Sequence, residues 1–504
     1  MESGAIDPAA LIRALGDPDD AVVRETHGAW VLLAGERAYK VKKPVALAFL
    51  DYSTLPRRLR ACREEVEVNA ALAPGLYLGV RALVRTPGGV ALGAAGEDPA
   101  AVEYAVEMRR FDEAQTMEAH VRAGTLAGSR VDEVAHRLAA FHRGAARCEG
   151  GAEPFARRLR SDVDEVAQLA RGEEPPALDG RRRFAASAAE RFASELDARA
   201  ARGLCRDGHG DIRAEHVILS EPPMVFDRIE FDPGLRRADV GSDLAFLAMD
   251  LERLGARGAA ERLVRSYAAA GGDPGGSRLR ALFAWQRALV RLKVALIAGD
   301  AGGARALAAL AERLAWRARA PVVLLVTGPP ASGKSTLAAA LAERLELPVV
   351  SSDVVRKSLA GLAPHERAPA SAYRPSATIE TYRELAARAA AELRRHPGVI
   401  VDATARSREL RAALLEGVGA AEPKALIVCE VPREELARRA LARQRSATRV
   451  SDATAEVALE LADAFEPPDE LDPAVVCRVR TDVEEAAVLE RVARWLDDRL
   501  SPAS

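Results

Sequence analysis

The segment at residues 328–335 constrains the fold of this chain more than any other feature of its sequence. It reads Gly-Pro-Pro-Ala-Ser-Gly-Lys-Ser and fits the pattern Gly-x-x-x-x-Gly-Lys-Ser, between an apolar run at residues 322–326 and a helical run at residues 336–345. Glycines in this pattern allow successive backbone N–H groups to turn toward one anion at the N-terminus of a helix. The segment therefore predicts a strand, a phosphate-binding loop and a helix.

Two side chains of this loop have separate expected roles. Lys334 would reach the β- and γ-phosphates of ATP, and the hydroxyl of Ser335 would bind Mg²⁺. We expect the nucleotide to contact the following residues: Gly328, Pro329, Ala331, Ser332, Gly333, Lys334, Ser335 and Thr336.

Residues 321–504 have the pattern of an α/β domain with a parallel sheet. Apolar runs alternate with helical segments, which is typical of a sheet covered on both faces. These runs lie at residues 347–350, 399–401, 425–428 and 475–479. Asp402 follows one of them, and an acid at a strand end near the phosphate loop suits Mg²⁺ or its waters.

The residues from Ser351 to Arg356 read Ser-Ser-Asp-Val-Val-Arg and follow the second apolar run of this domain. They resemble the Asp-x-x-Arg acceptor motif of polynucleotide kinases, zeta-type toxins and the P-loop kinases near gluconate kinase. This resemblance implies that Asp353 accepts the proton of an acceptor hydroxyl and that Arg356 helps to hold the acceptor or phosphate. In the alternative interpretation, Asp353 only caps the following helix.

Arginines crowd the helical segment at residues 433–445. The segment resembles the lid of the same kinase group, in which arginines close over the transferring phosphate. We expect Arg443, and next Arg439, to act in this way, whereas the other arginines would form a solvated helical face.

Residues 1–315 predict a second domain, of the α+β class, with a mixed lobe followed by a helical lobe. Strand-like runs at residues 29–33, 37–41 and 76–84 surround one helical run at residues 55–73. Helical patterns occupy residues 116–206, with a polar break at 172–180, and residues 239–319. The domain boundary is expected at residues 315–321.

The segment at residues 209–216 reads His-Gly-Asp-Ile-Arg-Ala-Glu-His, and Met-Val-Phe-Asp follows it, ending at Asp227. These residues resemble the catalytic loop and the metal-binding acid of the aminoglycoside and choline kinase-like phosphotransferases, which share the protein-kinase architecture. The resemblance implies that Asp211 deprotonates an acceptor hydroxyl and that Asp227 binds Mg²⁺. His216 replaces the family's asparagine; as a neutral imidazole it can bind a metal and is a candidate ligand, although an imidazole suits Mg²⁺ less well than an amide oxygen.

Other positions agree with this resemblance. Lys40 ends a strand in the context Ala-x-Lys, and Glu65 on the next helix is its expected ion-pair partner; Lys42 points to the same face of the strand and is the alternative contact for ATP. The run at residues 104–108 would be the hinge strand, so that Glu107 and Met108 meet adenine through their backbone groups.

The whole arrangement resembles bacterial proteins in which an aminoglycoside phosphotransferase-like domain is fused to an ATP-binding kinase. It implies an enzyme with two ATP and Mg²⁺ sites that phosphorylates hydroxyl groups of small molecules or of a nucleic-acid end. In the second interpretation, the N-terminal domain binds a nucleotide or metabolite without turnover and regulates the other domain. A third interpretation, an ATPase that acts by conformational change, lacks a recognisable arginine finger.

Charge and cysteine content limit the partners. The chain has 72 basic and 74 acidic residues, so no global field would hold nucleic acid or a membrane, and we expect no stable complex with either. Its five cysteines are widely spaced, and its N-terminus lacks an apolar signal segment. We therefore expect a cytoplasmic protein; neither composition nor motif indicates an oligomeric state.

Overall fold

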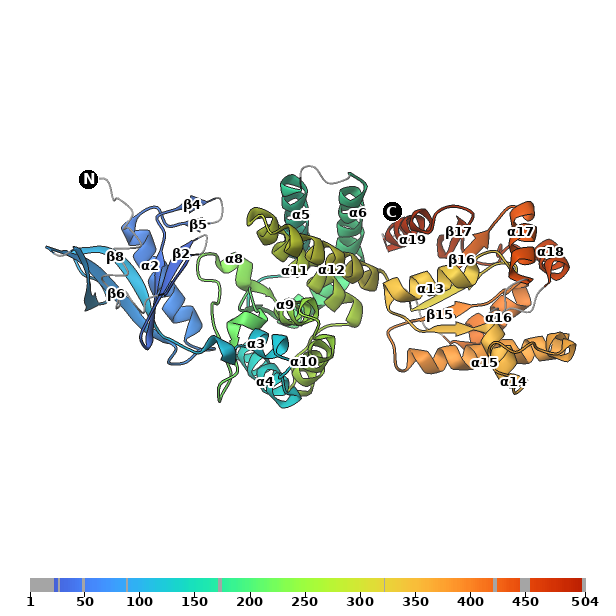
Figure 1. Cartoon of the computed structure of the whole chain (residues 1–504), viewed down its shortest axis with the longest axis horizontal. Coiled ribbons are helices and arrows are strands. Elements are labelled where there is room, and N and C mark those ends of the chain that lie inside the picture. The colour runs from blue at the N-terminus through green and yellow to red at the C-terminus, as the bar shows by residue number, and fades with distance from the viewer. Residues whose placement is uncertain are drawn as a thin grey trace. The chain divides into compact units, whose positions relative to one another are not determined.

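The computed structural model describes residues 22–25, 28–47, 50–87, 89–170, 175–320, 322–419, 424–444 and 454–500. The chain divides into two compact units (Figure 1). The first unit contains Met1–Asp162, Phe192–Gly276 and Phe283–Ala308, and the second contains Val163–Arg191, Ser277–Leu282 and Ala309–Ser504. The units interleave along the chain, so the boundary at residues 315–321 stays a proposal. No helix within the described residues is long and apolar enough to cross a membrane.

An antiparallel sheet of six strands forms one lobe of the first unit, in the order β1-β2-β3-β8-β6-β7. Helix α2 (Leu55–Asn69) packs against β6 and β8, and the hairpin β4 (Ala46–Leu47) and β5 (Leu50–Asp51) precedes it. The predicted strands and the helix of this lobe are confirmed. The strands are β1 (Val22–Glu25), β2 (Ala29–Ala34), β3 (Arg37–Lys42), β6 (Tyr77–Thr86), β7 (Gly89–Ala95) and β8 (Ala101–Arg109).

Helices form the other lobe of the first unit, as Figure 1 shows for α3, α4, α9 and α10. Their apolar faces share a core in which Val134 and Leu138 of α4 meet Leu244 of α9 and Leu263 of α10. The helices are α3 (Met117–Arg122), α4 (Gly128–Gly144), α5 (Ala152–Leu169), α7 (Ala193–Ala201), α8 (Pro233–Arg236), α9 (Val240–Arg253), α10 (Arg257–Ala269), α11 (Ser277–Ile297) and α12 (Ala301–Arg319), of which α5, α11 and α12 continue into the second unit.

Two short antiparallel ribbons in the helical lobe position the segment that carries Asp211. One ribbon joins β9 (Cys205–Asp207) to β12 (Arg237–Asp239), and the other joins β10 (Val217–Ile218) to β11 (Met224–Val225). The segment 208–216 therefore begins at the first ribbon and ends at the second, and the segment 226–236 returns between them.

The second unit is built on a parallel sheet of five strands in the order β14-β15-β13-β16-β17, as the sequence predicts. Alternate residues of β13 point to opposite faces. Leu324 and Val326 join the core under α13 and α19, whereas Val323 and Leu325 join the core under α15 and α16. The strands are β13 (Val323–Thr327), β14 (Val349–Ser351), β15 (Val399–Asp402), β16 (Lys424–Glu430) and β17 (Val476–Arg480).

Figure 1 shows helices along both faces of this sheet. They are α13 (Lys334–Leu345), α14 (Ser352–Leu359), α15 (Pro375–Leu393), α16 (Arg408–Gly417), α17 (Arg433–Gln444), α18 (Ala455–Asp463) and α19 (Glu485–Leu500). Helix α6 (Pro175–Arg191) also belongs to this unit and packs against α19. The predicted polar break at 172–180 is wrong from Pro175 onward, because proline is well tolerated at the first position of a helix.

Candidate functional site

The phosphate loop joins β13 to α13 and has a positive φ at three of its residues. The angles are 147° at Gly328, 71° at Ala331 and 85° at Gly333. At Gly328 a side chain is also excluded by space, because a Cβ atom would lie 2.7 Å from the carbonyl oxygen of Cys429. These turns bring the chain to the N-terminus of α13 in the way an anion-binding loop requires.

Lys334 is the first residue of α13 and is only 6% exposed. Among the described residues, no carboxylate forms an ion pair with its ammonium group. A buried ammonium without a counter-ion is costly, and a bound phosphate would relieve that cost. Ser335 and Thr336 follow it in the first turn of α13 and are exposed.

The end of β17 is tied to this loop. The hydroxyl of Thr481 donates to the carbonyl oxygen of Ser332 at 2.6 Å, and Arg439 Nη2 donates to the carbonyl oxygen of Thr481 at 2.8 Å. Beside these contacts lies a cavity of about 380 Å³. Its walls include Gly333, Thr336, Leu337, Arg438, Arg439, Thr481, Val483 and Val488.

Asp353 and Asp402 lie at the carboxyl edge of the sheet, next to the strand that enters the phosphate loop. In the sheet register, Asp402 pairs with Val326 of β13 on one side and with Ser351 of β14 on the other. Asp353 is the second residue of α14, whose N-cap is Ser351, so the alternative in which Asp353 caps the helix is wrong. The oxygen donors of Ser335 and Asp402 have the chemistry that Mg²⁺ prefers.

The three arginines predicted to hold phosphate or acceptor in this unit have different outcomes. Arg439 contacts Glu435 and the carbonyl oxygen of Thr481 beside the phosphate loop. Arg356 Nη1 donates to the carbonyl oxygen of Ala372 at 2.7 Å, and its guanidinium lies 4.7 Å from the ring centre of Tyr373. These contacts hold a neighbouring loop and favour a structural role over the predicted phosphate contact. Arg443 lies in α17, but its side chain, like residues 445–453, is outside the described part of the chain.

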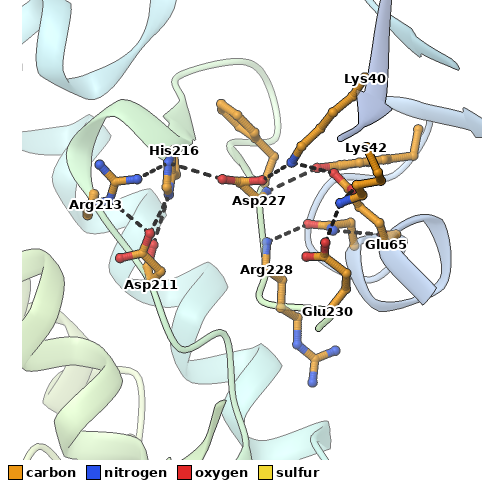
Figure 2. A network of polar contacts seen from close by, with 12 residues as sticks. Lys40, Lys42, Glu65, Asp211, Arg213, His216, Asp227, Arg228 and Glu230 are labelled. Carbon is orange, nitrogen blue, oxygen red and sulfur yellow. Dashed lines mark hydrogen bonds and ion pairs between the residues drawn. The ribbon is translucent and has the colours of Figure 1, made fainter. Parts of the chain in front are cut away.

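The first unit holds a second site, centred on Lys40 (Figure 2). Lys40 Nζ lies 2.8 Å from Glu65 Oε1 and 2.7 Å from Asp227 Oδ1. All three line a cleft of about 600 Å³, together with Met108 and His216. The predicted residues Lys40, Glu65, Asp227 and Met108 are thus brought together.

Lys42, the alternative to Lys40, lies in the core instead. It is 2% exposed and forms ion pairs with Glu65 Oε2, at 2.5 Å, and with Glu230. Burial lowers the pKa of Lys42, but Glu230 and Glu65 raise it by more than burial lowers it, so the group stays charged. The hydroxyl of Tyr52 donates to Glu230 at 2.8 Å. Lys42 is therefore committed to this network.

The buried network couples three elements of the first unit. Glu65 of α2 lies between both lysines of β3, and Glu230 fixes the loop that carries Asp227. Two ammonium groups face three carboxylates, which leaves one negative charge for a further cation. The sequence gives no local signal for Glu230 as a partner of Lys42, because 188 residues separate the two along the chain.

Glu107 points out of the cleft. Its carboxylate lies 3.7 Å from Arg37 Nε and 3.9 Å from Arg81 Nη1, and Tyr39 donates to it at 3.4 Å. The cleft at this strand is instead lined by Met108 and the residues at 109–111. The predicted contact with adenine is through the backbone groups of this strand and does not depend on the Glu107 side chain, so it stays a prediction.

Asp243 and His209 hold the loop that carries Asp211. Asp243 accepts hydrogen bonds from the backbone N–H of His209 at 2.5 Å and of Gly210 at 2.9 Å. His209 Nε2 lies 3.0 Å from the carbonyl oxygen of Phe226, and the N–H of Asp211 faces its Nδ1 at 3.3 Å. His209 is thus neutral with the proton on Nε2; burial lowers its pKa to about 4.

Arg213 and His216 fill the space beside Asp211, as Figure 2 shows. Arg213 Nε donates to Asp211 Oδ2 at 3.0 Å, and Arg213 Nη2 lies 2.7 Å from His216 Nε2. His216 Nδ1 lies 2.9 Å from the carbonyl oxygen of Asp211, so Nδ1 carries the proton and Nε2 accepts from Arg213. Burial raises the pKa of Asp211, but Arg213 and His216 bring it below its usual value.

This arrangement fits one Mg²⁺ better than two. Asp227 offers carboxylate oxygens to a metal that also binds phosphates and water. The lone pair of His216 Nε2, 3.6 Å from Asp227 Oδ2, is already used by Arg213, so His216 does not supply the second site. Within the described residues, no group of three or more His, Cys, Asp or Glu side chains could hold a metal ion alone.

Known proteins resemble separate parts of the chain. A protein-family model described as an AAA domain matches residues 323–468. A gluconokinase from Sinorhizobium meliloti is 20% identical over 36% of this chain and 94% of its own, with a TM-score of 0.26. Aminoglycoside phosphotransferase APH(4)-Ia, in a thermostable mutant, is 14% identical over 61% of this chain and 98% of its own, with a TM-score of 0.39.

Relatives of nearly full length come from mycobacteria. The uncharacterized protein Rv2004c of Mycobacterium tuberculosis is 34% identical over 484 residues, which are 92% of this chain and 93% of that protein. The uncharacterized protein Mb2027c of Mycobacterium bovis matches to the same extent. The chain therefore belongs to the family of these mycobacterial proteins.

Proposed function

We propose that the protein is an ATP-dependent phosphotransferase with two separate nucleotide sites, each of which transfers phosphate to a hydroxyl group. One observation carries the proposal: each unit places a lysine at a loop or cleft suited to phosphate and carries an acid that can act as a base on a nearby segment. The second unit has Lys334 at the start of α13 and Asp353 at the start of α14. In the first unit, Lys40 contacts Asp227 in the cleft, and His216 lies 3.6 Å from Asp227 and 3.8 Å from Asp211.

In the P-loop unit, the chain binds ATP mainly through backbone and one ammonium group. The loop at 328–333 and the N-terminus of α13 receive the β- and γ-phosphates, and Lys334 neutralises their charge. Adenine occupies the cavity beside Thr481 and Arg439. Asp353 accepts the proton of the acceptor hydroxyl. Ser335 and Asp402 would hold Mg²⁺, which supplies charge neutralisation at the transferring phosphate.

In the first unit, side chains bind the phosphates, a role that the backbone of the phosphate loop has in the P-loop unit. Lys40 binds the α- and β-phosphates while Glu65 orients it, and the cleft beside Met108 takes the adenine. Asp227 would hold a single Mg²⁺ with the phosphates. Asp211 accepts the proton of the acceptor hydroxyl after Arg213 has moved away from the Asp211 carboxylate.

A second candidate function for the first unit is nucleotide or metabolite sensing. It is favoured by the contact between Arg213 and Asp211, because a guanidinium on the carboxylate and a lowered pKa make Asp211 a weaker base. In this version, the unit binds ATP and controls the P-loop kinase. The acceptor of either site is a small molecule or a nucleic-acid end that carries a hydroxyl group.

The test is phosphate transfer by the full chain, by three single variants and by the double variant that combines Lys334→Ala with Lys40→Ala. Lys334→Ala should leave only first-unit activity, Lys40→Ala should leave only P-loop activity, and Lys43→Ala serves as a control because Lys43 pairs with Glu25 away from the cleft. Labelled ATP and a panel of sugars, polyols, aminoglycosides, nucleosides and RNA ends serve as substrates. Transfer that survives both Lys334→Ala and Lys40→Ala together would contradict the proposal.

A further inference from the structure

Arginines from three elements surround the loop that carries Asp211. Arg213 contacts Asp211 itself, as described above. Arg287 Nη1 of α11 donates to the carbonyl oxygen of Gly210 at 3.1 Å. Arg253, at the end of α9, pairs with Asp250 at 2.8 Å.

Arg253 reaches the loop through its partner, since the other oxygen of Asp250 accepts from the backbone N–H of Ala214 at 2.9 Å. The guanidinium groups of Arg213, Arg253 and Arg287 therefore border the segment 210–214 on several sides.

Arg291 adds a positive charge that has no counter-ion. It follows Arg287 by one helical turn, on the same face of α11. Its Nε is buried and has no hydrogen-bond partner, and no carboxylate within the described residues pairs with it. Burial lowers the pKa of Arg291, and Arg213 lowers it further while Asp211 opposes this effect. Because Arg287, one turn earlier on the same face of α11, contacts the carbonyl oxygen of Gly210, Arg291 lies on the side of α11 that faces this loop and would gain from a bound anion.

The acids near this loop are already engaged, so they offer little to a cationic acceptor. Asp250 is held by Ala214 and Arg253, Glu215 pairs with Arg213, and Asp243 accepts from the backbone of the loop. A polyamine would meet unpaired positive charge beside Asp211, whereas an anionic compound would meet two guanidinium groups.

We propose that the acceptor of the first unit carries a phosphate or carboxylate group in addition to the hydroxyl that is phosphorylated, and that Arg291 and Arg213 bind this anionic group. The inference rests on the phosphotransferase function proposed for this unit. Arg213 leaves Asp211 when it binds the anion, and Asp211 is then free to accept a proton. A bond forms between the acceptor oxygen and the γ-phosphorus, the bond from that phosphorus to ADP breaks, and the hydroxyl proton moves to Asp211.

In this proposal Arg213 exchanges Asp211 for the anionic group of the acceptor. The exchange explains why the catalytic base should form an ion pair with an arginine before the acceptor binds. Without an acceptor, the contact with Arg213 at 3.0 Å keeps Asp211 weakly basic, which protects ATP from hydrolysis by water. An anionic acceptor removes the contact and activates the base in the same step. A neutral acceptor would leave Arg213 on Asp211.

The experiment uses the full chain with Lys334→Ala, so that only the first unit can react. Each acceptor is compared with a related compound that carries an added anionic group: glycerol with glycerol 3-phosphate, glucose with glucose 6-phosphate, and glucose with gluconate; kanamycin is the cationic probe. Calorimetry measures the binding of each compound to the chain with a non-hydrolysable Mg-ATP analogue, and mass spectrometry measures phosphorylated product. We expect at least one anionic member to bind at least 10-fold more tightly than its neutral partner.

The variants Arg291→Gln and Arg291→Lys test the residue itself. Arg291→Gln should remove most of the preference for the anionic member while the affinity for the nucleotide stays within twofold, and Arg291→Lys should restore part of it. Arg257→Gln is the control, because Arg257 pairs with Glu261 on an exposed helical face. Thermal unfolding checks that each variant folds.

The outcomes separate this inference from the proposed function. Equal binding of charged and neutral members, a preference for kanamycin, or a preference that Arg291→Gln leaves unchanged would overturn the inference alone. If the Lys334→Ala chain binds no Mg-ATP, the nucleotide site proposed for the first unit is overturned.

Discussion

Lys334 and Lys40 are both placed to meet phosphate, but the two units prepare them in opposite ways. Lys334 is buried at a helix N-terminus and has no carboxylate partner among the described residues, whereas Lys40 holds Glu65 and Asp227 at 2.8 and 2.7 Å. The site of the P-loop unit is formed mainly by the backbone conformation of its loop, whereas the site of the first unit is formed by a network of side chains. A bound phosphate supplies the counter-ion that Lys334 lacks, whereas a phosphate that approaches Lys40 must compete with Glu65 and Asp227.

The largest expected effect therefore falls on the P-loop unit. Lys334→Ala removes the ammonium group from its phosphate site, and we expect phosphate transfer by this unit to fall by about 10³-fold or more. Transfer is measured at saturating ATP in a Lys40→Ala background, which silences the other unit. Unchanged turnover would show that Lys334 does not bind the phosphates.

Asp353→Asn tests the base of the same unit. Transfer to the acceptor should slow by about 10²-fold, because a general base typically contributes between ~10²- and ~10⁴-fold, while ATP affinity stays nearly the same. Turnover and nucleotide binding are measured on one preparation. A loss of stability with a normal rate per folded molecule would instead indicate a structural role for Asp353.

Glu230→Gln tests the network of the first unit. Lys42 would lose a buried counter-ion, and we expect the free energy of unfolding to fall by about 3 kcal/mol. Tyr52→Phe is the matched control, since it removes only one hydrogen bond from Glu230 and should cost about 1 kcal/mol. Both values come from denaturant unfolding. Equal costs for the two variants would show that the charge of Glu230 is unimportant.

The stability of the first unit should also depend on pH through His209. In the folded chain burial opposes the charged form of His209 and lowers its pKa to about 4. In the unfolded chain its pKa is near the ordinary value of 6.5. The unfolded chain therefore binds a proton that the folded chain does not, and stability falls as the pH falls. From pH 7 to pH 5 the loss is about 2 kcal/mol. His209→Asn should reduce this slope, and an unchanged slope would contradict the assignment.

The two units also differ in how much of their site could be predicted. The phosphate loop and Lys334 are contiguous, so a local pattern contains the whole arrangement, and the parallel sheet around it is confirmed. In the first unit, 187 residues separate Lys40 from Asp227, and only the resemblance to a known family relates them.

Side-chain contacts between segments that lie far apart in the sequence could not be predicted from local patterns. The motif predicts that Arg356 holds the acceptor or phosphate, but its contacts are decided by the 3-10 turn at residues 370–373, which no nearby sequence signal links to it. Glu230, Tyr52 and the position of Arg213 on Asp211 likewise depend on which segments meet in the fold. The sequence predicts a polar break at residues 172–180, whereas a helix begins at Pro175.

The most direct test of two independent nucleotide sites is the stoichiometry of Mg-ATP analogue binding, measured by calorimetry on the full chain. We predict two sites per wild-type chain, one site in Lys334→Ala, one site of different affinity in Lys40→Ala, and none in the double variant. A single site in the wild-type chain that Lys334→Ala abolishes would contradict this account and leave the first unit with only the fold of a kinase.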